Sequence, residues 1–355
     1  MRPGICPQLL RILRLLARIS GMTKSNLQGS VPDKRAPHPH DAEARLIYDL
    51  ELRLGVTHAR QRLGLERSTE AQIIGRGMNL FHPENWYSMH TVIRSCLRMI
   101  GLLSRGQRNS RKIALVENRF AHPELPAAFE GYRILHLSDL HVDMDEINLQ
   151  NLIERVRPLE YDLCVLTGDY RRDTSGAIDG ALDGMRKLRP HLNGDVLTVL
   201  GNHDSIRMLP ALEDMNYHCL MNEHVEIEAG NDSLWIAGVD DPHYYRADNL
   251  EKAAEAFPPG AFSLLLSHTP EIYRQAAHAG FDLFLCGHTH GGQICLPGGF
   301  PLTLDADCPR FVGKGHWQYE GMQGYTSAGS GTSIVNVRLN CPAEVTVHTL
   351  SRGPR

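Results

Sequence analysis

The sequence predicts an α/β fold in which the sheets mix parallel and antiparallel strands. After Arg111, short β-type runs alternate with helical spans, and near the C-terminus strand-type runs follow one another with no helix between them. The chain is also large enough, because 355 residues with 42% hydrophobic and 22% charged side chains can bury a sizeable core. A disordered chain, a fibre and a small disulfide scaffold are therefore excluded.

Residues 1–40 are expected to form a flexible basic tail that contains one short amphipathic helix. Between Leu9 and Ile19, three arginines recur at helical spacing opposite a leucine-rich side. Gly, Ser, Pro and His dominate from Gly21 to His40, as in a linker. The alternative is that translation starts at Met22. The sequence shows no cleavable secretory signal and no apolar stretch long enough to span a bilayer.

Residues 41–110 are predicted to be a helical N-terminal extension without a catalytic cluster. Asp41 is placed to cap the first helix, and a second helical pattern runs from Val92 to Leu103. Arginines and Lys112 follow this second pattern without any acidic residue among them. Two interpretations stay open: an interfacial helix beside anionic lipid headgroups, or a helix packed on the protein's own body with a solvated basic end.

Residues 111–355 are predicted to be the catalytic domain. The expected strands are Ile113 to Glu117, Arg133 to Leu137, Leu163 to Thr167, Val196 to Leu200, Leu234 to Val239, Phe262 to Ser267, Phe281 to Cys286, Gln323 to Ser327, Ile334 to Val337 and Glu344 to Thr349. This part is net acidic, whereas residues 1–116 are net basic, and the whole chain carries −4. An acidic body argues against nucleic acid as a partner and suits bound cations.

The eight cysteines are widely spaced and contain no C-x-x-C pair. Reduced thiols in the cytoplasm are the expected state. We therefore expect a cytoplasmic protein, either free or peripheral on the cytoplasmic face of the inner membrane.

Several predicted strands end in the same way, with an apolar run followed at once by Asp, His or Asn beside a small residue. In open α/β sheets the carboxyl ends of strands converge on a ligand-binding crevice, so five strand ends can deliver polar side chains to one place. These candidate site residues are Asp139, His141, Asp169, Asn202, His203, Asp204, His268, His288 and His290.

Seven of these residues are candidate metal ligands: two Asp, one Asn and four His, with no Cys. Oxygen and imidazole donors suit divalent Mn, Fe or Zn better than Ca or a thiolate-type zinc site. Seven ligands exceed the needs of one tetrahedral ion. Two ions roughly 3.5–4 Å apart that share a carboxylate would use all of them and would stabilise both oxygens of a phosphoryl displacement.

With its ordered blocks D-x-H, G-D, G-N-H-D, H and G-H-x-H, the sequence resembles the calcineurin-like metallophosphoesterase superfamily from about Arg111 to Leu350. The resemblance implies the metallo-dependent phosphatase fold, an α/β/β/α sandwich of two mixed sheets flanked by helices. It also implies two divalent ions, with Mn favoured over Fe or Zn. The implied ligands are Asp139, His141 and His290 for one ion and Asn202, His268 and His288 for the other, with Asp169 as the bridge.

The resemblance further implies two catalytic residues that do not bind metal. His203 is similar to the family's histidine that faces the leaving group, and Asp204 is placed to orient it. Asp173 stands at a different offset from the second acid of many relatives, so a ligand role for it is not expected.

The blocks are most similar to a bacterial branch with H-L-S-D-L-H, T-G-D-Y, G-V-D-D-P-H and C-G-H-T-H-G-G-Q. Some members of that branch are assigned as UDP-2,3-diacylglucosamine hydrolases of lipid A synthesis. Many carry an N-terminal transmembrane helix, for which the basic helices of this chain would substitute.

For residues near these blocks the sequence allows only less specific interpretations. His136 is opposite in strand phase to Asp139 and is interpreted either as a residue that orients a ligand or, the favoured interpretation, as a buried structural side chain. Asp241 and His243 lie at a turn and are interpreted either as a wall on the substrate side or as supports for the ligands. Small-residue loops at 291–293 and 329–332 could cradle phosphate, but turn geometry explains their glycines equally well.

The predicted function is hydrolysis of a phosphodiester or pyrophosphate bond by direct attack of a metal-bridging hydroxide, with a phosphate-ester substrate such as a UDP-linked lipid A precursor. One alternative is a general soluble phosphodiesterase acting on nucleotides or sugar phosphates. Another is a catalytically silent metal-binding scaffold, which the intact ligand set disfavours.

Overall fold

The computed structural model describes residues 41–75 and 87–354, in two compact units, Met1–Asp49 and Leu50–Arg355. The predicted tail of residues 1–40 lies outside the described residues. In the first unit the structure describes the start of helix α2 (Ala42–Leu54), where Asp41 Oδ1 accepts a hydrogen bond from the Ala44 amide at 3.0 Å, as predicted.

Helices occupy the described chain ahead of the first strand. After α2 come α3 (Val56–Gly75), α4 (Tyr87–Met99) and α5 (Leu103–Ser110). Gly55, at φ +86°, separates α2 from α3 because this left-handed conformation ends a helix. In the described parts of the chain no helix is both long and apolar enough to cross a membrane.

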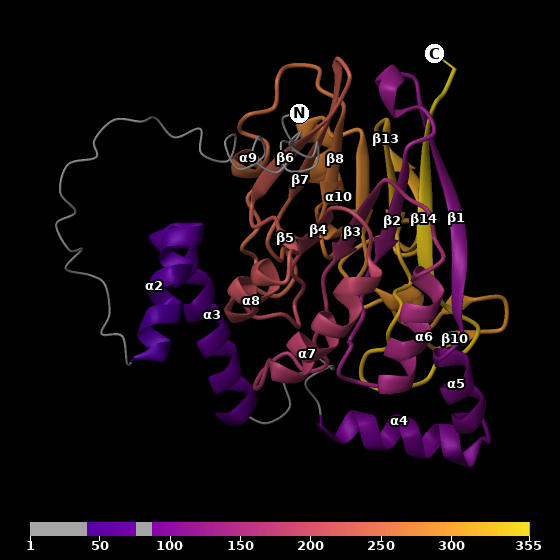
Figure 1. Ribbon diagram of the computed structural model, residues 1–355. Helices are drawn as coiled ribbons and strands as arrows, with labels where there is room; N and C mark the ends of the chain where they lie inside the picture. The colour runs from indigo at the N-terminus through magenta and orange to yellow at the C-terminus, as the bar shows by residue number, and fades with distance from the viewer. Residues whose placement is uncertain (1–40, 76–86, 355) are drawn as a thin grey trace, which may run out of the picture. The chain divides into compact units, whose positions relative to one another are not determined.

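One six-stranded sheet has the order β1-β14-β2-β3-β4-β5. Its strands are β1 (Ile113–His122), β2 (Arg133–Leu137), β3 (Leu163–Thr167), β4 (Val196–Val199), β5 (His218–Cys219) and β14 (Ala343–Arg352). β14 runs parallel to β1 and antiparallel to β2, so the sheet is mixed. Figure 1 shows β1 and β14 side by side, although they are far apart in the sequence.

A second six-stranded sheet has the order β12-β13-β9-β8-β7-β6. Its strands are β6 (Glu223–Ala229), β7 (Asp232–Gly238), β8 (Ser263–Leu266), β9 (Leu283–Cys286), β12 (Gly315–Tyr319) and β13 (Met322–Thr326). It is also mixed, because β7, β8, β9 and β13 run parallel while β6 and β12 pair antiparallel at its two edges. β10 (Cys295–Leu296) and β11 (Phe300–Pro301) form a separate small pair.

The two sheets share one apolar core. Successive residues of a strand point to opposite faces of its sheet, so every second residue faces the other sheet. Ile236, Leu264 and Leu285 pack in a cluster with side chains of the first sheet such as Val165 and Val199. The helices after the strands are α6 (Glu146–Val156), α7 (Asp179–Leu188), α8 (Leu209–Asp214), α9 (Leu250–Ala253) and α10 (Tyr273–Ala279). The 3₁₀ turns are η2 (Ala127–Phe129), η3 (Arg189–His191), η4 (Ile206–Met208), η5 (Pro270–Ile272), η6 (His290–Gly292) and η7 (Arg310–Val312).

On its other face the second sheet packs against helix α10. The alternate residues Leu265 and Phe284 lie in a separate buried cluster with Tyr273 and Ala276 of that helix. The predicted α/β class, with two packed mixed sheets and flanking helices, is confirmed.

The predicted strand at Ile334 to Val337 is wrong. This segment is a loop in which Ile334 has φ +61°, and Val335 and Val337 pack against Leu97 of α4. Its side chains are apolar because they are buried under the N-terminal helices. A short apolar run looks the same in the sequence whether it forms a buried strand or a buried loop. The strands β6 and β12 were not predicted. Both lie at sheet edges, and exposed residues alternate in them with more buried ones.

Candidate metal centre

The structure brings all nine predicted site residues to one buried region. They follow five strands: β2, β3 and β4 of the first sheet, and β8 and β9 of the second. Each of the nine is at most 6% exposed. The carboxyl ends of the two sheets' parallel strands thus supply the site jointly, as the strand-end pattern predicted.

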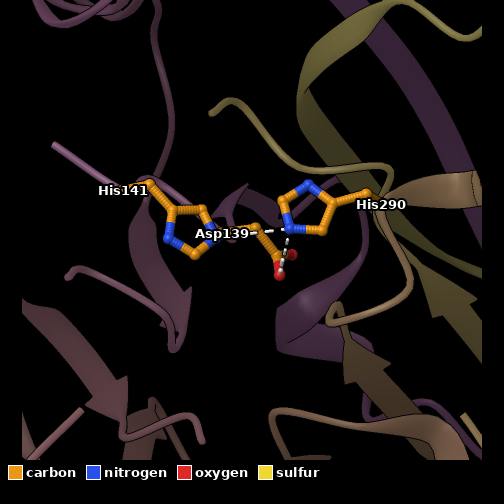
Figure 2. A group of neighbouring side chains, drawn as sticks. All are labelled: Asp139, His141 and His290. Atoms are coloured by element: carbon orange, nitrogen blue, oxygen red, sulfur yellow. Dashed lines mark hydrogen bonds and ion pairs between the residues drawn. The ribbon is translucent and has the colours of Figure 1, made fainter. Parts of the chain in front are cut away.

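The first group that could hold a metal ion consists of Asp139, His141 and His290 (Figure 2). His290 Nε2 lies 3.5 Å from Asp139 Oδ1 and 3.3 Å from His141 Nε2. His141 Nδ1 donates to the Arg171 carbonyl at 2.8 Å, which leaves the Nε2 lone pair directed at the other two side chains. A hydrogen bond on the far ring nitrogen is how proteins orient a histidine ligand.

The second group is Asp169, His268 and His288, with Asn202 beside it. His268 Nε2 lies 2.9 Å from Asn202 Oδ1, 3.1 Å from His288 Nδ1 and 3.3 Å from Asp169 Oδ2. His268 Nδ1 donates to the Thr167 carbonyl at 2.7 Å, so in the neutral ring Nε2 is an acceptor. That acceptor faces the Asn202 and Asp169 oxygens, and a proton or a metal ion between them would satisfy all three.

Asp169 lies between the two groups. Its Oδ2 is 3.3 Å from His268 Nε2, 3.8 Å from His141 Nε2 and 3.9 Å from His203 Nε2. Its Oδ1 accepts from the His203 amide at 2.9 Å, which fixes the carboxylate. One carboxylate therefore faces histidines from three different strand ends.

The backbone around the site is in an uncommon conformation. Five of the site residues have positive φ: Asp139 (51°), His141 (40°), Asp169 (58°), His288 (70°) and His290 (49°). Residues other than glycine rarely occupy this region, and such strain is typical of functional sites. Close packing adds a further demand, since a Cβ at Gly201 would overlap Asp169 Oδ1 and one at Gly287 would overlap Ser138 Oγ.

The charges in the site are strongly coupled. Burial opposes protonation of His268, but the carboxylates of Asp169 and Asp139 outweigh it and raise the pKa of His268 to about 10. Burial also opposes ionisation of Asp169, but His268 and His203 outweigh it and lower the pKa of Asp169 well below its usual range. Without a metal ion, the site therefore holds a proton where its acceptors converge.

His141, His288 and His290 are held neutral, which is the form that ligates metal. Burial and then the nearby His203 lower the pKa of His141 to about 4. Burial also lowers the pKa of His288 and His290 well below the usual range, and Arg338 contributes at His290. Burial, with repulsion from Asp169, raises the pKa of Asp139 to about 6.

His203 and Asp204 do not form the pair that the sequence suggested. His203 Nδ1 donates to the Arg172 carbonyl at 2.6 Å. Asp204 instead accepts backbone hydrogen bonds, from the Gly201 and Asp169 amides through Oδ2 and from the Tyr170 amide through Oδ1. The expected orienting role of Asp204 is therefore corrected: its carboxylate fastens the loop after β3 to the loop after β4.

Sequence reasoning missed two residues of α3 that support the site. Glu66 accepts from Ser205 Oγ at 2.6 Å and from the Ile206 amide at 2.9 Å, directly after His203 and Asp204. Arg62 is fully buried, donates to the Asp204 carbonyl at 3.0 Å and pairs with Glu66 at 2.7 Å. The i, i+4 spacing of Arg62 and Glu66 was visible in the sequence, but it does not distinguish a buried pair from a solvated one.

Of the residues near the motifs, some have a structural role and others lie beside the candidate metal centre. His136 is fully buried and bonds His348 and Thr167, consistent with a structural role. His243 adjoins the site, with its ring centre 4.3 Å from that of His288 and its Nδ1 2.8 Å from Glu271. Asp241 accepts from the amides of residues 243–245 and so holds this loop.

The donor set fits divalent metal ions. The chemistry of the groups is carboxylate and imidazole, with the lone pairs of His141 and His268 turned inward by their carbonyl partners. The buried His288 Nε2 has no hydrogen-bond partner within the described ranges, and its Nδ1 faces the second group.

This fold and these buried His/Asp groups define a metallophosphoesterase, and the chain belongs to the calcineurin-like phosphoesterase family, whose sequence model matches residues 132–292. Over 242 residues the chain is 31% identical to an uncharacterized metallophosphoesterase of Aquifex aeolicus, covering 64% of this chain and 87% of that protein. It is 29% identical to the uncharacterized metallophosphoesterase YkoQ of Bacillus subtilis, covering 74% of this chain and 100% of the relative. It is also 29% identical to the transmembrane protein with metallophosphoesterase domain of Bos taurus, covering 75% of this chain and 63% of that protein.

Proposed function

We propose that this metallophosphoesterase uses two divalent metal ions to hydrolyse a phosphodiester or pyrophosphate bond by direct attack of water. The observation that carries the proposal is the position of Asp169, whose Oδ2 lies within 3.3–3.9 Å of three histidine Nε2 atoms. A carboxylate between two sets of donors is the arrangement that a two-ion site requires.

Seven residues would hold the two ions. Asp139, His141 and His290 would bind one ion, and Asn202, His268 and His288 the other, with Asp169 shared. Mn²⁺ is the favoured ion, and Fe or Zn also suits these donors. Bound there, two cations supply a lowered pKa for water and neutralise charge on the phosphoryl oxygens. Residues 111–355 would form the catalytic domain, extended by helices in 41–110.

His203 would protonate the departing oxygen. The Arg172 carbonyl holds its Nδ1–H, so Nε2 faces the site, 3.9 Å from Asp169 Oδ2. Hydrogen bonds of this kind fix the tautomer and orientation of a histidine that transfers protons. Asp204 would support the step indirectly, by joining the backbone of the two loops that carry Asp169 and His203.

A UDP-linked lipid A precursor is the substrate we favour, and it would bring the enzyme to a membrane surface. The surface of α4 and the turn after it supports this, because Val92, Met99 and Ile100 are 54%, 79% and 64% exposed. Arg94 and Arg98 are exposed on the same helix. Apolar side chains flanked by arginines fit an anionic bilayer surface.

The test is Mn²⁺-dependent hydrolysis of three substrates by the full-length protein: bis(p-nitrophenyl) phosphate, p-nitrophenyl phosphate and UDP-2,3-diacylglucosamine. We expect turnover of the UDP-lipid, lost in Asp169→Asn. Its phosphate leaving group departs without protonation, so His203→Ala should lower this turnover far less than that of an alkyl diester. Turnover of small diesters alone would establish a general soluble phosphodiesterase. Failure to hydrolyse any of them while two ions bind would overturn the proposal in favour of a silent scaffold.

A further inference from the structure

A cationic cavity lies between α5 and the segment 338–342, outside the groups that could hold metal ions. Its volume is about 280 Å³, below the roughly 300 Å³ at which pockets for drug-sized ligands begin. The lining residues are Arg105, Asn109, Lys112, Arg338, Asn340, Cys341 and Pro342. Three of the seven are permanent or near-permanent cations, and none is acidic.

Two of the three cations in this lining, Arg105 and Lys112, have no paired carboxylate among the described residues. Both residues are exposed. Arg111, the residue before Lys112, pairs with Asp145 at 2.8 Å. Lys314 adds a further cation behind the wall, with Nζ 3.2 Å from Cys341 Sγ. Exposed cations without a paired carboxylate favour binding of an anion.

Arg338 forms the fully buried wall of the cavity. Its Nε and Nη2 donate to the Gly331 carbonyl at 3.0 and 2.7 Å, and Nη2 also donates to the Ala328 carbonyl at 2.6 Å. Nη1 has only two long contacts, 3.4 Å to the Pro342 carbonyl and 3.5 Å to the His290 carbonyl. Nη1 is therefore the donor with most capacity left, and no carboxylate in the described ranges pairs with this buried guanidinium.

The cavity is built by tight contacts and not by a loose loop. The Arg338 amide donates to the Gly106 carbonyl at 3.0 Å, and Asn109 Nδ2 donates to the Arg338 carbonyl at 3.1 Å. A Cβ at Gly106 would lie 2.9 Å from that of Val337, so α5 packs directly on this segment. A rigid frame of this kind holds the exposed Arg105 and the buried Arg338 in the lining of the same cavity.

We propose that this cavity is a second anion site, which binds a tetrahedral phosphate group. Its source is either free inorganic phosphate or the phosphomonoester headgroup of an anionic lipid, and guanidinium groups recognise both through the same oxygens. Arg338 Nη2 also lies 3.3 Å from His290 Nδ1, so one residue borders both this cavity and the metal centre. The proposal does not depend on the substrate of the enzyme.

The test counts phosphate ions bound to the full-length, Mn²⁺-loaded protein by calorimetric titration, at constant ionic strength set with NaCl. Arg105→Gln/Lys112→Gln is expected to bind one phosphate fewer than the wild type. Arg108→Gln, an exposed cation of α5 that does not line the cavity, is expected to match the wild type. The expected difference of one bound phosphate between the wild type and the double variant does not depend on whether the metal centre also binds phosphate. The result can therefore be interpreted even if the proposed function is wrong.

Equal phosphate counts in the wild type and the double variant would overturn the proposal, as would an equal loss in Arg108→Gln. A vesicle arm separates the two sources. Co-sedimentation with phosphatidylcholine vesicles that contain phosphatidic acid, reversed by inorganic phosphate and lost in the double variant, would identify the lipid headgroup. Phosphate binding without such co-sedimentation would identify the free ion.

Discussion

The loops after the strands and helix α3 both hold the site, but they do so by different means. The loops hold it through the backbone, with positive φ at Asp139, Asp169 and His288 and with the amides of residues 169 and 170 bonded to Asp204. Helix α3 holds it through charged side chains. Arg62 donates to the Asp204 carbonyl and Glu66 accepts from the Ile206 amide, in the segment just after His203.

The difference separates the residues that would do the chemistry from those that would place them. A loop residue would supply a ligand or proton-transfer atom, so its loss would remove a reaction component. An α3 residue sets the position of another residue, so its loss shifts geometry by a fraction of an ångström and leaves the components present. The two regions should therefore differ in the size and the type of effect that mutations cause.

The largest effect is expected at the shared carboxylate. Asp169→Asn removes the charge that faces both groups, and we expect kcat/KM to fall by at least about 10³-fold, because a metal ion contributes several kcal/mol to the transition state. Activity and bound Mn²⁺ should be measured together, and both should fall. Asp183→Asn, an exposed carboxylate of α7, is the matched control and should behave as wild type. Retention of both ions in Asp169→Asn would contradict its bridging role.

His203→Ala comes next and should leave metal binding intact. Loss of a proton donor in the transition state is expected to lower kcat by about 10²–10³-fold for substrates with an alkoxide leaving group. The loss should be much smaller for p-nitrophenyl esters, because p-nitrophenolate departs without protonation. His191→Ala, on η3, is the control. An equal loss for both leaving groups would assign His203 to some other role.

Glu66→Gln tests the role of helix α3 and should lower kcat less than the two loop variants do. The amide keeps the size of the side chain but loses the charge that Arg62, Ser205 and the Ile206 amide share. We expect kcat to fall by about tenfold with bound Mn²⁺ and KM little changed, as for other residues that orient catalytic groups. Loss of metal from this variant, or a loss as large as that of Asp169→Asn, would erase the distinction between loop and helix.

The smallest effect is a proton count. Because Asp169 and Asp139 outweigh burial and raise the pKa of His268 to about 10, the metal-free centre holds that proton at pH 8, and Mn²⁺ must displace it. Calorimetry in buffers of different ionisation enthalpy should show about one proton released per chain at pH 8. The count should fall towards zero above pH 10 and rise below pH 6, where Asp139 is also protonated. A heat independent of the buffer would show that His268 is not charged before metal binds.

The strand-end residues could be identified from the sequence because each follows its own apolar run within a few positions. His288 and His290 directly succeed β9, and the glycine before them allows the sharp approach to Ser138. The strand at Arg133–Leu137 was predicted for the same reason, since it is a short, almost wholly buried apolar run. The bonds from Asp204 to the loop after β3 could not be predicted, because the amides of Asp169 and Tyr170 are more than 30 residues away.

The sequence by itself determined the α/β class, the candidate site residues and their order along the chain, because these depend on short-range patterns of apolar and polar residues. Only the tertiary structure decided that α3 supports His203 through Arg62 and Glu66, that residues 334–337 are a buried loop, and that Arg338 lies between an anion-sized cavity and His290. These features depend on which distant segments pack together. That choice is made by the burial of the whole core, and no local pattern encodes it.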